Sequence, residues 1–230
     1  MKLTVDKARR EFLRSRNGSN VLCAVAETDL VMEGGTLTAL SGPSGSGKST
    51  LLHMCAGLLP PTDGRILLDE TDLYRLEDKE QSLLRNRHIG VVPQGQTALQ
   101  ALNVLDNVLV PYALYGRQKG SGYDEIRTQA RDLLEQAGIQ DLERVMPSEL
   151  SGGELRRMAV CRALLLKPAI LLADEPTGDL DEENTGIVMG LLKDHAARGG
   201  CVFVVTHDRQ VWDYADRILE MKKGIVTAQK

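Results

Sequence analysis

The chain has 230 residues, of which 42% are apolar and 26% charged, a composition that is typical of a globular protein and excludes a disordered one. Its 28 Lys and Arg against 32 Asp and Glu give a net charge of −4, so the chain lacks the broad basic surface of a nucleic-acid-binding protein. A membrane-spanning helix needs about 20 mostly apolar residues, and no such stretch is present.

Short apolar runs alternate with helical segments along the chain. Such runs are typical of strands that are covered on both faces of a sheet. The alternation therefore favours an α/β fold with a mostly parallel sheet. The strand candidates are Thr36–Leu40, Arg65–Leu68, His88–Val92, Ala169–Ala173 and Cys201–Val205.

The middle of the chain has a helical pattern instead. Residues 122–138 carry apolar side chains at helical spacing and end in Gly138, a typical helix stop. Further helices are predicted over Val104–Tyr115 and from about Ser151. We therefore expect one domain, residues 1–230. A helical subdomain at 95–165 would be inserted between two parts of an α/β core, 1–94 and 166–230.

Residues 42–49, GPSGSGKS, match the phosphate-loop pattern G-x-x-x-x-G-K-[ST] between an apolar run and a helical segment at 49–56. Glycines let backbone N–H groups turn toward phosphate oxygens, and a helix N-terminus attracts negative charge. Lys48 would supply a cation for the β- and γ-phosphates, and the Ser49 hydroxyl could bind Mg²⁺. The alternative, a Gly/Ser linker with an incidental lysine, is disfavoured by the strand before and the helix after.

An acidic pair, Asp174 and Glu175, follows the apolar run at 170–173. Ligands of open α/β sheets bind at the carboxyl ends of the strands. Asp174 is suited to hold Mg²⁺ through water. Glu175 could polarise an attacking water, provided that a turn at Pro176 brings it to the same site. Two solvated acids at a strand end are the alternative.

Ser151 and Glu154 form a capping-box pattern, S-x-x-E, at the start of the helical stretch 155–166. A capping box does not require the two glycines between them, which weaken a first helical turn. Paired glycines make sense where bare backbone N–H groups approach an anion. Capping plus phosphate contact is therefore favoured over capping alone.

Six motifs follow one another along the chain: GPSGSGKST at 42–50, VVPQ at 91–94, LSGGE at 150–154, ILLADEP at 170–176, GDLD at 178–181 and VVTHD at 204–208. Together they resemble those of ATP-binding cassette (ABC) ATPases, the nucleotide-binding subunits of ABC transporters. The resemblance covers about residues 12 to 220 and implies hydrolysis of ATP to ADP and phosphate. It also implies a P-loop NTPase (RecA-like) core with an N-terminal antiparallel β subdomain.

The resemblance also implies residue roles. Glu175, His207 and Gln94 would be catalytic, and Ser49, Gln94 and Asp174 would hold Mg²⁺. Family members sandwich two ATP molecules in a head-to-tail dimer. The residues that would contact the ATP of the opposite subunit are Ser151, Gly152, Gly153, Glu154 and Asp181. The residues that would bind the nucleotide of their own subunit are Phe12, Gly42, Ser44, Gly45, Ser46, Gly47, Lys48, Ser49 and Thr50.

Two of these residues carry open questions. Phe12 is the only aromatic residue among the first 50, so it is the local candidate for stacking on adenine, with a core or edge-strand role as the alternative. Glu154 stands where the family usually has Gln. We expect its carboxylate to point back at its own cap and to leave activity intact.

The resemblance further implies partners. We expect a second copy of the chain, a separate transmembrane permease, and a cytoplasmic location on the inner face of the membrane. The motifs resemble a subgroup that serves lipoprotein release, macrolide or antimicrobial-peptide efflux, and cell division. The alternatives are a soluble ABC ATPase acting on nucleic acid or ribosomes, and a non-hydrolysing regulatory module.

The four scattered cysteines are expected to be reduced, buried thiols.

Overall fold

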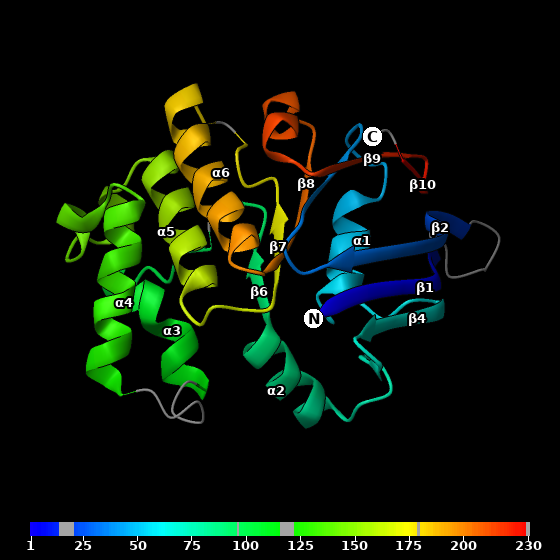
Figure 1. Ribbon diagram of the computed structural model, residues 1–230, viewed down its shortest axis with the longest axis horizontal. Helices are drawn as coiled ribbons and strands as arrows, with labels where there is room; N and C mark the ends of the chain where they lie inside the picture. The colour runs from blue at the N-terminus through cyan, green and yellow to red at the C-terminus, as the bar shows by residue number, and fades with distance from the viewer. Residues whose placement is uncertain (14–20, 96, 116–121, 179, 229–230) are drawn as a thin grey trace.

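The computed structural model describes residues 1–13, 21–95, 97–115, 122–178 and 180–228. These residues form two sheets and the helices that cover them (Figure 1). No helix in these ranges is both long enough and apolar enough to cross a bilayer.

The smaller sheet is antiparallel and has the order β2-β1-β4-β5. Alternate side chains of β1, such as Leu3 and Val5, are buried and face the interior. This sheet is the expected N-terminal antiparallel subdomain. Its strands are β1 (Lys2–Leu13), β2 (Val21–Glu33), β4 (Asp63–Leu68) and β5 (Thr71–Asp72).

The larger sheet has the order β10-β9-β3-β8-β7-β6 and is parallel except for the β10–β9 pair. Every residue of β3, β7 and β8 is buried, as expected for strands covered on both faces. The strands are β3 (Leu37–Ser41), β6 (Ile89–Val92), β7 (Ile170–Asp174), β8 (Cys201–Thr206), β9 (Arg217–Lys222) and β10 (Ile225–Ala228).

Helix α1 (Lys48–Cys55) lies between the two sheets. Its Leu51 and Leu52 share one hydrophobic cluster with Val5 of β1 and with Leu172 and Phe203 of the larger sheet. Because apolar side chains surround α1 on both sides, the phosphate loop that precedes it is attached to a rigid element.

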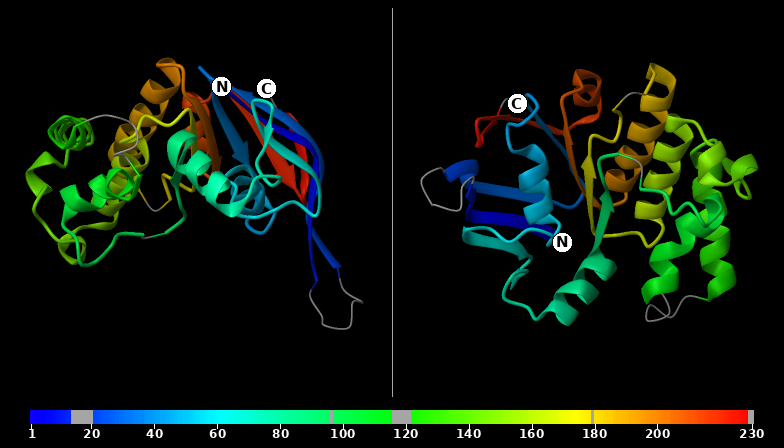
Figure 2. Two further views of the ribbon diagram at one scale, coloured as in Figure 1. Left: turned by 90° about the horizontal axis from the view of Figure 1, so that it is seen from below. Right: turned by 180° about the vertical axis from the view of Figure 1, so that it is seen from behind.

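The other face of the larger sheet is covered by helices. This helical group lies on the side of the molecule away from the antiparallel sheet (Figures 1 and 2). One hydrophobic cluster joins Leu134, Met158 and Leu192 of these helices to Leu171 of β7. The helical group therefore shares its core with the sheet. The helices are α3 (Val104–Tyr115), α4 (Tyr123–Gln136), α5 (Gly152–Leu164) and α6 (Glu182–Ala197), with short 3₁₀ turns at Gln140–Leu142, Pro147–Glu149 and Arg209–Tyr214.

Three features differ from the sequence-based expectations. The run Arg65–Leu68 lies in the antiparallel sheet, where only Ile66 and Leu68 are buried, and is not covered on both faces. Helix α2 (Asp78–His88) was not predicted; it has no buried residue and hence no apolar periodicity. Cys23 is exposed, which corrects the expectation that all four thiols are buried.

Candidate nucleotide-binding site

The register of the larger sheet brings three predicted motifs to one edge. Ser41, at the end of β3, pairs with Thr206 of β8, and Asp174 of β7 pairs with Val205. The residues that follow these strands are Gly42, Glu175 and His207. Because parallel strands end at a common edge, segments more than 120 residues apart meet there.

The phosphate loop requires glycine at two of its positions. Gly42 and Gly47 have positive φ values of 154° and 109°, a region that other residues rarely adopt. A Cβ atom at Gly42 would collide with the Met221 carbonyl oxygen, and one at Gly47 with the Ala24 carbonyl oxygen. The backbones of β2 and β9 therefore pack directly against the loop and leave no space for a side chain at these two positions.

The Lys48 side chain is folded onto the loop. Its ammonium donates hydrogen bonds to the Gly42 carbonyl (2.8 Å) and the Pro43 carbonyl (3.1 Å), and the residue is 6% exposed. The Ser46 hydroxyl is buried and has no hydrogen-bond partner among the described residues. In the described part of the chain, this buried cation is thus held by two carbonyls and lies in the same loop as an unsatisfied hydroxyl. Both features fit a loop that accepts an anion such as a phosphate group.

Ser49 and Asp174 form the candidate metal site. The Ser49 hydroxyl donates a hydrogen bond of 3.1 Å to the Asp174 carboxylate. Burial raises the pKa of Asp174, because the charged form loses solvation. A cation beside this buried acid would stabilise its charged form. A hydroxyl and a carboxylate, completed by substrate phosphates, fit the ligand preference of Mg²⁺.

Glu175 and His207 contact each other across the strand ends. Glu175 has a left-handed backbone (φ 49°) and donates its N–H to the Val205 carbonyl at 2.8 Å. Its Oε1 lies 2.9 Å from His207 Nδ1, and its Oε2 accepts hydrogen bonds from the His207 N–H (3.3 Å) and the Thr206 hydroxyl (3.0 Å). The turn after β7 thus brings Glu175 to the same cleft as the phosphate loop, as Pro176 suggested.

Lys48, Ser49, Glu175 and His207 line one cleft of about 850 Å³, whereas Gly42 and Asp174 are not part of its lining. Gln94, after β6, is exposed on its wall, and Phe12 of β1 is part of its lining. The Arg10 guanidinium lies 4.7 Å from the centroid of the Phe12 ring in a cation–π contact. The loop residues in the lining include Ser44, Gly45, Ser46, Gly47, Lys48, Ser49 and Thr50.

Part of the lining was missed by the sequence reasoning. Leu22, Cys23 and Ala24 of β2 belong to the lining, as do Lys223 and Gly224 of the β9–β10 turn. The Gly224 N–H donates a hydrogen bond of 2.9 Å to the Ser46 carbonyl, which ties this turn to the phosphate loop. The pairing of distant strands carries no local motif, so only the adjacent lysines and glycine at 222–224 offered a signal.

The residues predicted to meet the opposite ATP lie elsewhere. Ser151 caps α5, and the Glu154 side chain accepts hydrogen bonds from the Ser151 N–H (2.7 Å) and hydroxyl (2.8 Å), so it turns back onto its cap as expected. Asp181 caps α6 through the Asn184 N–H at 2.8 Å. Gly152 lines a smaller hollow of about 160 Å³. None of the residues 151–154 lines the 850 Å³ cleft.

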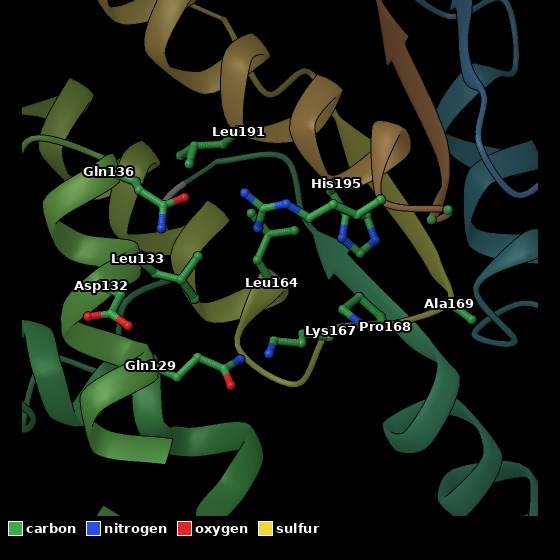
Figure 3. Close-up of a pocket in the computed structure, with 13 residues that line it drawn as sticks. Gln129, Asp132, Leu133, Gln136, Leu164, Lys167, Pro168, Ala169, Leu191 and His195 are labelled. Atoms are coloured by element: carbon green, nitrogen blue, oxygen red, sulfur yellow. The ribbon is translucent and has the colours of Figure 1, made fainter. Parts of the chain in front are cut away.

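A second cleft, of about 470 Å³, lies between α4, α5 and α6 (Figure 3). Gln129 and Leu133 of α4 face Lys167 and His195 across it. Burial lowers the pKa of His195. The cleft lies at the amino ends of β7 and β8, the opposite edge of the sheet from Lys48, and no predicted site residue lines it.

A glycine-rich loop between a buried strand and a helix, with a buried lysine and an acid at the end of another strand of the same sheet, defines the class of P-loop nucleotide-binding proteins. Within that class, the model of the family described as ABC transporter matches residues 25–178. The chain belongs to the ABC transporter family.

Curated relatives agree over nearly the full length. Three proteins named lipoprotein-releasing system ATP-binding protein LolD are 39% identical (Anaplasma marginale), 41% identical (Shewanella denitrificans) and 36% identical (Acinetobacter baylyi). The alignments cover 90%, 87% and 98% of this chain and 92%, 85% and 98% of the relatives. No relative named here supports an action on nucleic acid or ribosomes.

Solved structures agree with the fold. A dimeric post-hydrolysis state of the ATP-binding cassette MJ0796, bound to ADP and phosphate, is 31% identical and has a TM-score of 0.89, with 99% of each chain covered. A second dimeric MJ0796 structure has a TM-score of 0.88 at 32% identity. The chain is therefore the ATP-binding and ATP-hydrolysing subunit of an ABC transporter, on the P-loop fold that the sequence predicts.

Proposed function

We propose that two copies of this chain bind Mg-ATP between them head to tail, hydrolyse it, and drive a separate transmembrane partner. The separation of the two glycine-rich segments carries this proposal: residues 43–50 line the cleft, whereas residues 151–154 begin α5 outside it. A second copy would place its Ser151 and Gly153, with Asp181 beside them, against the phosphate held by Lys48. The dimeric MJ0796 structures support two copies as the active unit.

Each chain would contribute positioning and charge. Lys48 would leave the Gly42 and Pro43 carbonyls for the β- and γ-phosphates, and Ser49 with Asp174 and Gln94 would hold Mg²⁺. The bound Mg²⁺ would neutralise charge that develops on the phosphate oxygens. Glu175 would orient and polarise the attacking water, and His207 would contact the γ-phosphate while it holds Glu175. Such catalysis works without a covalent intermediate.

The partner surface would be an apolar groove of about 510 Å³ between the core and α3. The groove is lined by three exposed leucines, Leu58 (56% exposed), Leu99 (47%) and Leu114 (65%). Apolar side chains that gather at the surface mark sites of protein interaction. A short apolar segment of a membrane protein fits this surface. Gln94, in the wall of the nucleotide cleft, lies five residues before Leu99 of the groove. This short segment would connect the partner surface with the nucleotide. The chain would then be peripheral, on the cytoplasmic face of the membrane.

The relatives suggest the cargo. Because the curated relatives are named for lipoprotein release, we propose that the transported molecules are lipoproteins, recognised by the membrane partner.

A trapped dimer tests the proposal. Glu175→Gln should bind Mg-ATP, lose most turnover and run as a dimer on size-exclusion chromatography with ATP, and as a monomer with ADP. Adding Lys48→Ala to this variant should abolish the dimer, because the phosphates lose their cation. Normal turnover in Glu175→Gln, or a dimer that forms without nucleotide, would contradict the proposal.

A further inference from the structure

We propose that Thr206 is a positioning residue for ATP hydrolysis, because its buried hydroxyl holds the Glu175 carboxylate in the orientation needed to act on water. This inference rests on the role proposed above for Glu175. Thr206 is the last residue of β8 and is fully buried.

The direction of the hydrogen bond follows from the neighbours of the Thr206 hydroxyl. Its oxygen lies 3.0 Å from the Asp208 amide nitrogen and 3.0 Å from Glu175 Oε2. An amide N–H can only donate, so the hydroxyl accepts from Asp208. The single hydroxyl proton is then left for Glu175, whose Oε2 accepts it.

Glu175 needs such a hold because its backbone alone does not fix the carboxylate. The backbone is set by its left-handed φ of 49° and by the N–H to Val205 hydrogen bond, but three side-chain torsions remain. Its other side-chain partner, the His207 ring, is 69% exposed, whereas Thr206 is fully buried. The Thr206 hydroxyl is therefore the more rigid anchor.

Asp208 is itself fixed, which keeps its N–H directed at Thr206. Its Oδ2 accepts a hydrogen bond from the buried Thr177 hydroxyl at 3.1 Å, and its Oδ1 accepts one from the Gln210 N–H at 2.9 Å. Thr177 lies two residues after Glu175. These hydrogen bonds thus connect the residues that follow β7, Glu175 and Thr177, with Thr206 and Asp208 at the end of β8.

Steady-state kinetics of three variants test the inference. Thr206→Val keeps the shape but removes the hydroxyl, and should lower kcat at least about tenfold with KM for ATP changed less than about twofold. Thr206→Ser keeps the hydroxyl and should recover kcat to within about threefold of wild type. Thr38→Val, in neighbouring β3, is the matched control: this hydroxyl is also fully buried but has no partner among the described residues.

The outcomes separate this inference from the proposed function. A Thr206→Val variant with normal kcat, or a Thr206→Ser variant as slow as Thr206→Val, would overturn the inference. Glu175→Gln in the same assay tests the proposed function: if it is inactive while Thr206→Val is active, only the inference fails. Should Thr206→Val unfold below the assay temperature, Thr206→Ala replaces it under the same criteria.

Discussion

The Ser49 hydroxyl and the Asp174 carboxylate are 3.1 Å apart although 125 positions separate them in the chain. Ser49 belongs to α1, which packs against the larger sheet, and Asp174 ends β7 in that sheet. Both positions are therefore fixed by the core. Two of the three side chains proposed to hold Mg²⁺ are thus already in contact with each other.

Replacing Asp174 by Asn tests this assignment. The amide oxygen can still accept from Ser49, so we expect a folded protein, but the charge that would hold Mg²⁺ is lost. Mg²⁺-dependent turnover should fall at least about 100-fold. The measurement is ATPase rate against Mg²⁺ concentration. Asp63→Asn, an exposed acid in β4 outside the cleft, should leave the Mg²⁺ dependence unchanged, and equal curves for both variants would refute the assignment.

The cap of α5 should make stability depend on pH. Hydrogen bonds from the Ser151 N–H and hydroxyl lower the pKa of Glu154. A pKa that is lower in the folded than in the unfolded state stabilises the protein above the unfolded pKa, and this stabilisation is lost as pH falls through the folded pKa. Glu154→Ala should therefore cost about 0.3–1 kcal/mol at pH 7 and progressively less below the ordinary glutamate range.

Urea unfolding at several pH values checks this cap effect. Glu149→Ala, an exposed acid just before the cap, serves as the control and should show no such pH-dependent loss. Because Glu154 faces its own cap, Glu154→Gln should keep ATP turnover within about twofold of wild type. A pH-independent cost for Glu154→Ala, or a large loss of turnover in Glu154→Gln, would contradict the prediction.

The apolar groove predicts a charge-sensitive partner contact. Leu58→Glu and Leu114→Glu would place a carboxylate where an apolar segment should pack, so co-purification of the membrane partner should be lost while basal ATPase activity stays. Ile225→Glu is a matched control, since Ile225 is 57% exposed but lies outside the groove. Equal recovery of the membrane protein with all three variants would show that the groove is not the contact.

The thiols should differ sharply in reactivity. Burial raises the pKa of Cys55 and Cys161 to about 12 and of Cys201 to about 11, so these thiols stay protonated and inaccessible. Cys23 is exposed and lines the nucleotide cleft. One thiol per native chain should react with Ellman's reagent, and ATP should slow that reaction. Fast reaction of two or more thiols, or no protection by ATP, would contradict the described cleft.

Elements with strong local signals were predictable from the sequence. Helix α3 occupies Val104–Tyr115 as expected, and the run Cys201–Val205 forms β8 with one further residue. Buried strands and apolar helix faces leave such patterns in the sequence. Helix α2 leaves no such pattern, because all of its residues are at least partly exposed and it buries no apolar face.

The site was predictable where a motif is contiguous, as in residues 42–50. It was not predictable where β1, β2 and the β9–β10 turn fold over the loop, since long-range strand pairing leaves no motif. Likewise, the hydrogen bond between Thr206 and Glu175 depends on the register of β7 against β8, which the sequence does not reveal.

The shared hydrophobic cluster limits how the helices can move. Because Leu134, Met158 and Leu192 are buried in the same cluster as Leu171, swinging α4 and α5 away from the sheet would expose apolar surface at a cost of about 25 cal/mol for each Å². Packed layers of this kind slide past one another by small steps. If the proposed membrane partner contacts the exposed leucines of the groove, we expect its motion to reach the nucleotide cleft as a small shear of this packed layer.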